Sequence, residues 1–235
     1  MIRTRLLPLV VAAVALGALS GCTATSTTPS AGSTSGASAD GSSRARIVNP
    51  TVVTIGDSIM KGHGLFPSQA WPTLLARQHG WKLDNLACDG AGFLTTGDDS
   101  DCAATFSGLV DETVDLNPRT VIVEGSSNDF GEDDGRLIRV TESLISELHS
   151  ALPHTQIIGL STVWGDTAVP AQLAHVNEQV AIAVKKVGGT YVSIGQPLAG
   201  HPEWMQSDDV HPTGRGQQAI LEAVQAAFAK AHITA

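Results

Sequence analysis

Five short apolar runs, separated by segments of helical periodicity, limit the folds open to this 235-residue chain. The runs are residues 51–55, 83–87, 120–124, 156–161 and 190–194. Each run is almost continuously apolar, as expected of strands that are covered on both faces. Helical spacing of apolar residues is found between them in 137–152, 170–187 and 212–231. This alternation predicts an α/β fold with a mainly parallel, five-stranded, doubly wound sheet.

Residues 1–21 have the composition of an export signal. Arg3 and Arg5 precede an uncharged run, mostly of Leu, Val, Ala and Gly, that is shorter than the roughly 20 residues of a membrane-spanning helix. The sequence LSGC that ends at Cys22 resembles the lipobox of bacterial lipoproteins, in which the signal is cut before a cysteine that carries lipid. The alternative is an ordinary signal peptide with an incidental cysteine. We therefore expect export and lipid anchoring through Cys22 to the outer face of the bacterial cell membrane.

A low-complexity segment follows the export signal. Residues 22–46 begin with Cys22 and continue almost wholly as Ser, Thr, Gly, Ala, Asp and Pro. Such a segment cannot bury enough apolar surface to offset the entropy of ordering it, which predicts a flexible linker. Residues 47–235 then suit one domain with a single core. The net charge of −9 and the lack of a basic patch argue against nucleic acid as a partner.

Two cysteines remain once Cys22 is assigned to lipid. Cys88 and Cys102 form an even count in a chain that is expected to be exported, and oxidising conditions favour a disulfide between them. A loop of this length gains about 3 kcal/mol in the chain-entropy model. Free thiols or a metal site are the alternatives, but no His or Cys lies at zinc-finger spacing around the pair.

Two polar motifs contain the residue types of nucleophilic catalysis. Gly56-Asp57-Ser58 directly follows the first predicted strand, so Ser58 is placed at the carboxyl edge of the sheet, where ligands bind in such folds. Asp208 and His211 lie three residues apart before the last predicted helix. At this spacing Asp208 can accept the Nδ1 proton of His211 and leave Nε2 as a base for a serine hydroxyl. Taken alone, each motif is also common in turns and helix caps.

Gly90 and Asn128 follow the second and third predicted strands. Glycine lets a backbone N–H approach a substrate oxygen, and an asparagine amide is a neutral donor. Together with the Ser58 amide they would form an oxyanion hole. A tight turn and an Asx cap are the alternative roles. His63 lies in a glycine-rich loop soon after Ser58 and is expected to be exposed to solvent, although it could border the pocket.

In the order Ser, Gly, Asn and Asp-x-x-His, the chain resembles the SGNH (GDSL-like) hydrolase superfamily. The matching blocks are Gly56-Asp57-Ser58, Gly90, Asn128-Asp129 and Asp208 to His211. The resemblance implies a three-layer α/β/α sandwich. It further implies Ser58 as nucleophile, His211 as base and then acid, and Asp208 as the residue that orients His211. Gly90 and Asn128 would be oxyanion donors beside the amide of Ser58.

One position departs from the family pattern. The third block usually reads Gly-x-Asn-Asp, whereas Ser126 stands two residues before Asn128 and Gly125 lies one step earlier. The turn that carries Asn128 is therefore expected to have a different shape. The chain also has no Gly-x-Ser-x-Gly sequence, which argues against the ordinary α/β-hydrolase elbow.

The expected function is hydrolysis of a carboxylic ester through an acyl-Ser58 intermediate, with no metal and no organic cofactor. The substrate is left open among acetylated polysaccharide, a short-chain lipid ester and a small acylated metabolite. An acyltransferase would use the same triad, and a non-catalytic binding lipoprotein would keep the fold. Intact Ser58, Asp208 and His211 favour an enzyme, because a binding protein needs no base aligned with a hydroxyl.

Overall fold

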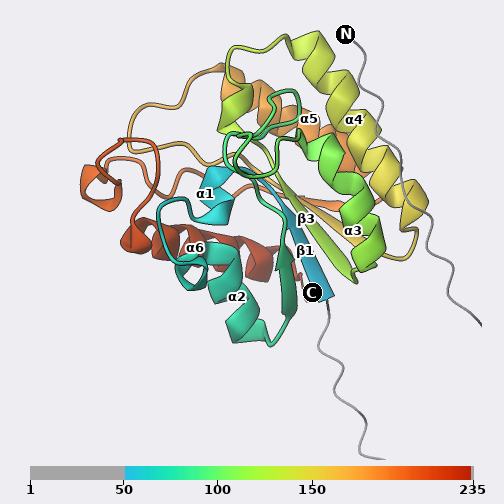
Figure 1. The fold of residues 1–235 in the computed structure, drawn as a ribbon, viewed down its shortest axis with the longest axis horizontal. Helices are drawn as coiled ribbons and strands as arrows, with labels where there is room; N and C mark the ends of the chain where they lie inside the picture. Colours follow the sequence, from blue (N-terminus) through green and yellow to red (C-terminus); the bar gives the residue numbers. More distant parts are fainter. Residues whose placement is uncertain (1–50, 234–235) are drawn as a thin grey trace, which may run out of the picture. The chain divides into compact units, whose positions relative to one another are not determined.

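A central sheet of five parallel strands organises the computed structural model, which describes residues 51–233 (Figure 1). The strands are β1 Thr51–Ile55, β2 Lys82–Asn85, β3 Thr120–Glu124, β4 Gln156–Leu160 and β5 Thr190–Val192. Their order across the sheet is β2-β1-β3-β4-β5, and every neighbouring pair is parallel. Because all strands run the same way, the loops at their carboxyl ends meet at one edge of the sheet.

Residues 51–233 also contain six α-helices and four short 3₁₀ helices, of which η4 and α6 follow the last strand. The α-helices are α1 Ser58–Lys61, α2 Trp71–His79, α3 Val110–Leu116, α4 Asp134–Ala151, α5 Gln172–Lys186 and α6 Gly214–Lys230. The 3₁₀ helices are η1 Pro67–Gln69, η2 Phe106–Leu109, η3 Ser127–Asp129 and η4 Pro202–Trp204. Within residues 51–233, no helix is both long enough and apolar enough to cross a membrane.

The helices cover both faces of the sheet, which confirms the predicted three-layer sandwich. Helices α2 and α6 lie on one face of the sheet, and α3, α4 and α5 lie on the other (Figure 1). The first group shares a core with Val52 and Ile122, and the second shares a core with Val53 and Val121. Consecutive strand residues point to opposite faces, so each strand supplies apolar side chains to both cores. This double burial explains why the runs are almost continuously apolar in the sequence.

Three strands, β2, β4 and β5, end before their apolar runs do, and side chains bind backbone amides beyond the ends of β2 and β5. The ladder between β4 and β5 stops at Val192, and the Ile194 amide donates to Ser161 Oγ at 3.0 Å. After β2, Asn85 Oδ1 accepts from the Thr54 hydroxyl at 2.7 Å and from the Ala87 amide at 3.2 Å. These polar side chains lie where the functional loops begin.

A disulfide joins Cys88 and Cys102, as the pair of cysteines predicts, with 6.0 Å between their Cα atoms. It closes the loop that follows β2. Three predictions lie outside the described residues: a signal peptide over 1–21, lipidation at Cys22 and a linker over 22–46.

Candidate active site

The Gly56-Asp57-Ser58 motif forms the turn from β1 into α1. A Cβ atom at Gly56 would lie only 2.5 Å from Met60 Sδ, so the turn needs a glycine here. Asp57 caps the helix, because its Oδ1 accepts from the Ile59 amide at 2.9 Å. Ser58 is thereby the first residue of the helix, and its N–H has no acceptor within the helix.

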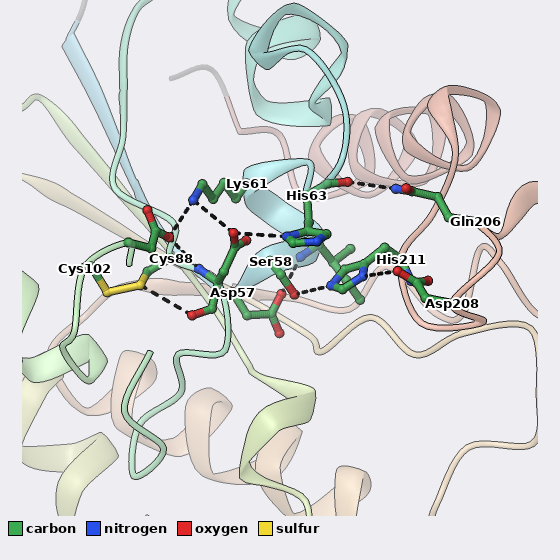
Figure 2. A network of polar contacts seen from close by, with 12 residues as sticks. Asp57, Ser58, Lys61, His63, Cys88, Cys102, Gln206, Asp208 and His211 are labelled. Atoms are coloured by element: carbon green, nitrogen blue, oxygen red, sulfur yellow. Dashed lines mark hydrogen bonds and ion pairs between the residues drawn. A yellow bond between two sulfur atoms is a disulfide. The ribbon is translucent and has the colours of Figure 1, made fainter. Parts of the chain in front are cut away.

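Ser58, His211 and Asp208 form a continuous chain of hydrogen bonds (Figure 2). His211 Nε2 lies 2.9 Å from Ser58 Oγ, and His211 Nδ1 lies 2.8 Å from Asp208 Oδ2. The structure thus brings together a hydroxyl, an imidazole and a carboxylate that are up to 153 residues apart in sequence. This arrangement lets the imidazole accept the hydroxyl proton while the carboxylate holds the opposite ring nitrogen protonated.

The loop that carries Asp208 also sets its charge. The backbone amides of His211 and Val210 each donate to Asp208 Oδ1 at 3.0 Å. The His211 amide, the His211 side chain and the Val210 amide together hold the pKa of Asp208 well below its usual range. Asp209 adopts a left-handed conformation with φ of 57°, which lets the chain turn between Asp208 and His211. Asp208 is therefore an ionised acceptor for the imidazole.

The predicted oxyanion donors line one pocket with the nucleophile. Ser58, Gly90, Asn128 and His211 all contribute to a cavity of about 190 Å³. Gly90 has φ of +74°, a conformation that favours glycine, and its amide makes no hydrogen bond to another residue of 51–233. Asn128 Nδ2 donates one hydrogen to Ala91 O at 2.9 Å, which leaves its second hydrogen for a ligand.

Ser126, the departure from the family pattern, is fully buried and connects the motifs. Its hydroxyl oxygen lies 2.9 Å from both Asp57 Oδ2 and Ala91 O, and it accepts from the Asn128 amide at 3.1 Å. The Ser126 side chain caps η3, which starts at Ser127, and a glycine at this position could not make that cap. Asn128 still reaches the pocket that holds Ser58.

Asp129 holds the loop after Gly90 in place. No role was predicted for this residue from the sequence. Its buried carboxylate accepts from the amides of Phe93, Leu94 and Thr95 at 2.7, 2.9 and 3.1 Å. Burial raises the pKa of Asp129, and these hydrogen bonds oppose the rise. The carboxylate therefore holds the loop after Gly90 against η3. Its position directly after Asn128 is the signal that could have revealed this role.

Two further residues lie near the site. The sequence left His63 between solvent exposure and the border of the pocket, and it gave Glu124 no role. His63 lines the pocket, and its ring stacks on that of His211 with 4.2 Å between centroids, although its side chain is still 41% exposed. Glu124, the last residue of β3, is fully buried, and burial together with the charge of Asp57 raises the pKa of Glu124 well above its usual range. Both depend on contacts between distant parts of the chain.

Over residues 51–233, no group of three or more His, Cys, Asp or Glu side chains is arranged to hold a metal ion.

The fold is shared with known ester-processing proteins. The psychrotrophic esterase EstA from Pseudoalteromonas sp. is 16% identical, with a TM-score of 0.62 over 78% of this chain and 99% of that one. The salicylyl-acyltransferase SsfX3 from a tetracycline biosynthetic pathway is 21% identical, with a TM-score of 0.60 over 79% and 56%. A family two carbohydrate esterase from Cellvibrio japonicus is 15% identical, with a TM-score of 0.62 over 78% and 62%.

At these identities the likeness concerns the fold alone. Comparison with curated proteins by sequence finds no significant match. A family model does match: the GDSL-like lipase/acylhydrolase model covers residues 54–219, a range that contains Ser58, Gly90, Asn128, Asp208 and His211. Because this model spans more than half of the sequence, the chain belongs to the GDSL-like lipase/acylhydrolase family and is an ester hydrolase of the serine type.

Proposed function

We propose that the protein hydrolyses short-chain carboxylic esters through an acyl-Ser58 intermediate. The observation that supports this most is the hydrogen-bonded chain from Ser58 Oγ through the His211 imidazole to the Asp208 carboxylate. A serine hydroxyl is a poor nucleophile until a base takes its proton, and the base needs an acceptor that fixes its tautomer. Both needs are met here at distances of 2.9 and 2.8 Å.

In the first half of the reaction, His211 Nε2 takes the hydroxyl proton as Ser58 Oγ attacks the ester carbonyl. The negative charge that develops on the carbonyl oxygen is stabilised by the amides of Ser58 and Gly90 and by Asn128 Nδ2. Removing one such donor typically costs on the order of 2.7 to 4 kcal/mol in the barrier. The C–O bond to the alcohol then breaks, and His211 returns the proton to the leaving oxygen.

In the second half, a water molecule replaces the alcohol. His211 removes a proton from this water as the water oxygen attacks the acyl carbon. The same donors stabilise the second tetrahedral intermediate, the bond to Ser58 Oγ breaks, and the proton returns to the serine. The products are a carboxylic acid and the free enzyme, and Asp208 stays ionised throughout.

The preference for short acyl groups is inferred from a neighbouring pocket. This pocket shares Ser127 and Val210 with the cavity that holds Ser58 and is also lined by Ile59, Val163 and Trp164. Its apolar walls suit a hydrocarbon chain. Its volume of about 90 Å³ is well below the roughly 300–1,000 Å³ of pockets that hold drug-sized ligands. The pocket therefore suits an acyl chain of a few carbon atoms.

Hydrolysis of p-nitrophenyl acetate, butyrate and octanoate by the purified protein and its Ser58→Ala variant tests the proposal. We expect turnover that is lost in the variant and that is fastest with the shorter esters. Equal and negligible rates in both proteins would contradict it. Added alcohol acceptors distinguish an acyltransferase, because a new ester would then form in preference to free acid.

We also propose that the protein is exported and anchored by lipid at Cys22. The support is the lipobox-like LSGC sequence behind a short apolar run, together with a disulfide of the kind formed in oxidising compartments. Fractionation of producing cells tests this. We expect the protein in the membrane fraction and a Cys22→Ala variant outside it; wild-type protein in the soluble fraction would contradict the anchor.

A further inference from the structure

A second histidine–carboxylate pair lies beside the first. His63 Nδ1 is 3.0 Å from Asp89 Oδ2, and the His63 ring stacks on the His211 ring with an interplanar angle of 28° (Figure 2). The two imidazoles are thus packed face to face, and each is bound at Nδ1 by a carboxylate, His63 by Asp89 and His211 by Asp208.

Asp89 is itself held in place from two sides. Lys61 Nζ lies 3.1 Å from Asp89 Oδ2, and the Asp89 amide donates to Asp101 Oδ2 at 2.8 Å. Lys61 also pairs with Asp101. The disulfide between Cys88 and Cys102 connects the residues next to the two aspartates. The carboxylate that binds His63 is therefore part of a cross-linked loop.

The backbone of His63 is also fixed to the loop of the catalytic histidine. Gln206 Nε2 donates to His63 O at 2.7 Å and to Pro212 O at 3.0 Å. A Cβ atom at Gly64 would lie 2.5 Å from Gln206 Oε1, so the glycine makes room for this brace. His63 and His211 are consequently held together through backbone contacts as well as through their rings.

We propose that His63 is a positioning residue that keeps the His211 imidazole in line with Ser58. The torsion that rotates an imidazole about its bond to Cβ has broad minima, so hydrogen bonds at its two nitrogens restrain the ring only weakly when water competes for them. Water does reach this site, since the Asp208 side chain is 44% exposed. The stacked His63 ring covers one face of His211 and opposes its rotation, and Asp89 keeps His63 in position. This inference rests on the proposed serine-hydrolase mechanism.

Kinetic constants for p-nitrophenyl acetate separate this role from a purely structural one. We expect His63→Ala to lower kcat by about tenfold to a hundredfold, the range in which small misplacements of catalytic groups act, and to leave KM within about twofold. His63→Phe should recover most of the loss, because a phenyl ring can still stack. Asp89→Asn should give an intermediate loss.

His79→Ala provides a matched control. His79 also stacks on an aromatic ring, that of Trp81, with 4.7 Å between centroids, but it lies at the end of α2 and outside the catalytic pocket. We expect its kcat to be unchanged. If His79→Ala lowers kcat as much as His63→Ala does, the loss reflects general destabilisation and the proposal is wrong.

A spectroscopic measurement gives a second readout. The proton shared by His211 Nδ1 and Asp208 should give a downfield proton resonance that broadens in His63→Ala and is retained in His63→Phe. Unchanged kcat in His63→Ala, or an equal loss in Ala and Phe variants, would overturn the positioning role. If His63→Ala does not fold, His63→Phe and Asp89→Asn are used for the test instead. If Ser58→Ala retains activity, the proposed function itself is wrong. If Ser58→Ala loses activity but His63→Ala keeps the wild-type kcat, only the positioning role of His63 is wrong.

Discussion

The carboxylate of Asp57 joins two of the sequence motifs. It accepts from the Ile59 amide, from the Ser126 hydroxyl and, at 3.4 Å, from the Ser127 amide. Burial raises the pKa of Asp57, and these hydrogen bonds oppose the rise. One buried side chain thus fixes the start of α1, which carries the nucleophile, relative to the start of η3, which carries an oxyanion donor.

Trp164 is expected to limit the length of the acyl chain. It lines the pocket of about 90 Å³, and its side chain is held by a hydrogen bond to Thr167 Oγ1 and by an edge contact with Phe130. Replacing it with alanine would open this pocket at one end. We expect Trp164→Ala to raise the ratio of octanoate to acetate turnover by about tenfold, the order of magnitude that one or two methylenes are worth in an apolar pocket. Wild-type ratios of kcat/KM in this variant would count against the assignment of the pocket.

The rate should fall on the acid side because of His211. Asp208 has a pKa well below its usual range, so it remains ionised as the pH decreases and cannot cause the loss. An imidazolium cannot accept the serine proton, and protonation of His211 therefore stops the reaction. Values of kcat/KM measured over about pH 5 to 8 should therefore decrease towards acid. A flat profile would be inconsistent with a histidine base.

Helix α6 secures the helix that carries the nucleophile. Gln217 is fully buried, and its Oε1 accepts from the Trp71 amide while its Nε2 donates to Ile59 O, both at 2.8 Å. Gln217→Leu would leave the buried Trp71 amide unpaired, at about 1–3 kcal/mol. It would also remove one of the two donors to Ile59 O, which keeps the Gly62 amide at 3.3 Å, at about 0.5–1.5 kcal/mol. We expect the free energy of unfolding to fall by about 2–4 kcal/mol in urea denaturation. Gln218→Leu, one residue along the helix near Glu222, is the matched control and should change it little.

Strands and long helices were predictable because each has its own periodic signal. The prediction for 120–124 matches β3, since every residue there is buried, and the spacing of Leu137, Leu144 and Leu148 identifies α4 by its buried face. Short elements such as α3, with seven residues, and η3, with three, are too short for the repeated spacing that identifies a long helix. Beyond the ends of β2 and β5, polar side chains bind backbone amides, and no apolar pattern reveals these contacts.

The residues of the site also fall into a predictable group and a group that the sequence does not reveal. Ser58, Gly90, Asn128, Asp208 and His211 stand in short motifs at strand ends, and one edge of the sheet necessarily gathers such residues. The stacking of His63 on His211 and the Gln206 brace connect segments 143 or more residues apart. Such contacts follow from the packing of loops, which a single sequence does not specify.

The stability of the molecule should depend on pH through Glu124. Its pKa is raised by burial and by Asp57, so the folded state keeps a proton that the unfolded chain releases above an ordinary glutamate pKa of about 4.3. The folded state binds more protons in this window, and stability therefore decreases as the pH rises through it.

Glu124→Gln removes this dependence, because the amide is neutral at every pH. We expect the stability of the variant relative to wild type to increase between about pH 5 and pH 8, as measured by chemical denaturation. Glu147→Gln, which changes an exposed residue of α4, should show no such increase. An equal pH dependence in all three proteins would mean that Glu124 is ionised in the folded state.

The distance in sequence between Ser58 and His211 bears on when the enzyme becomes active. A ribosome adds residues from the amino end, so a growing chain carries its nucleophile for 153 residues before it has a base. Helix α6, which braces α1, is made later still. An unfinished chain that lacks His211 therefore cannot hydrolyse esters by this mechanism. The protein gains its activity only late in its synthesis. A chain that stops before Asp208 should release no p-nitrophenol from the acetate ester, and turnover by it would show that the serine can act without this triad.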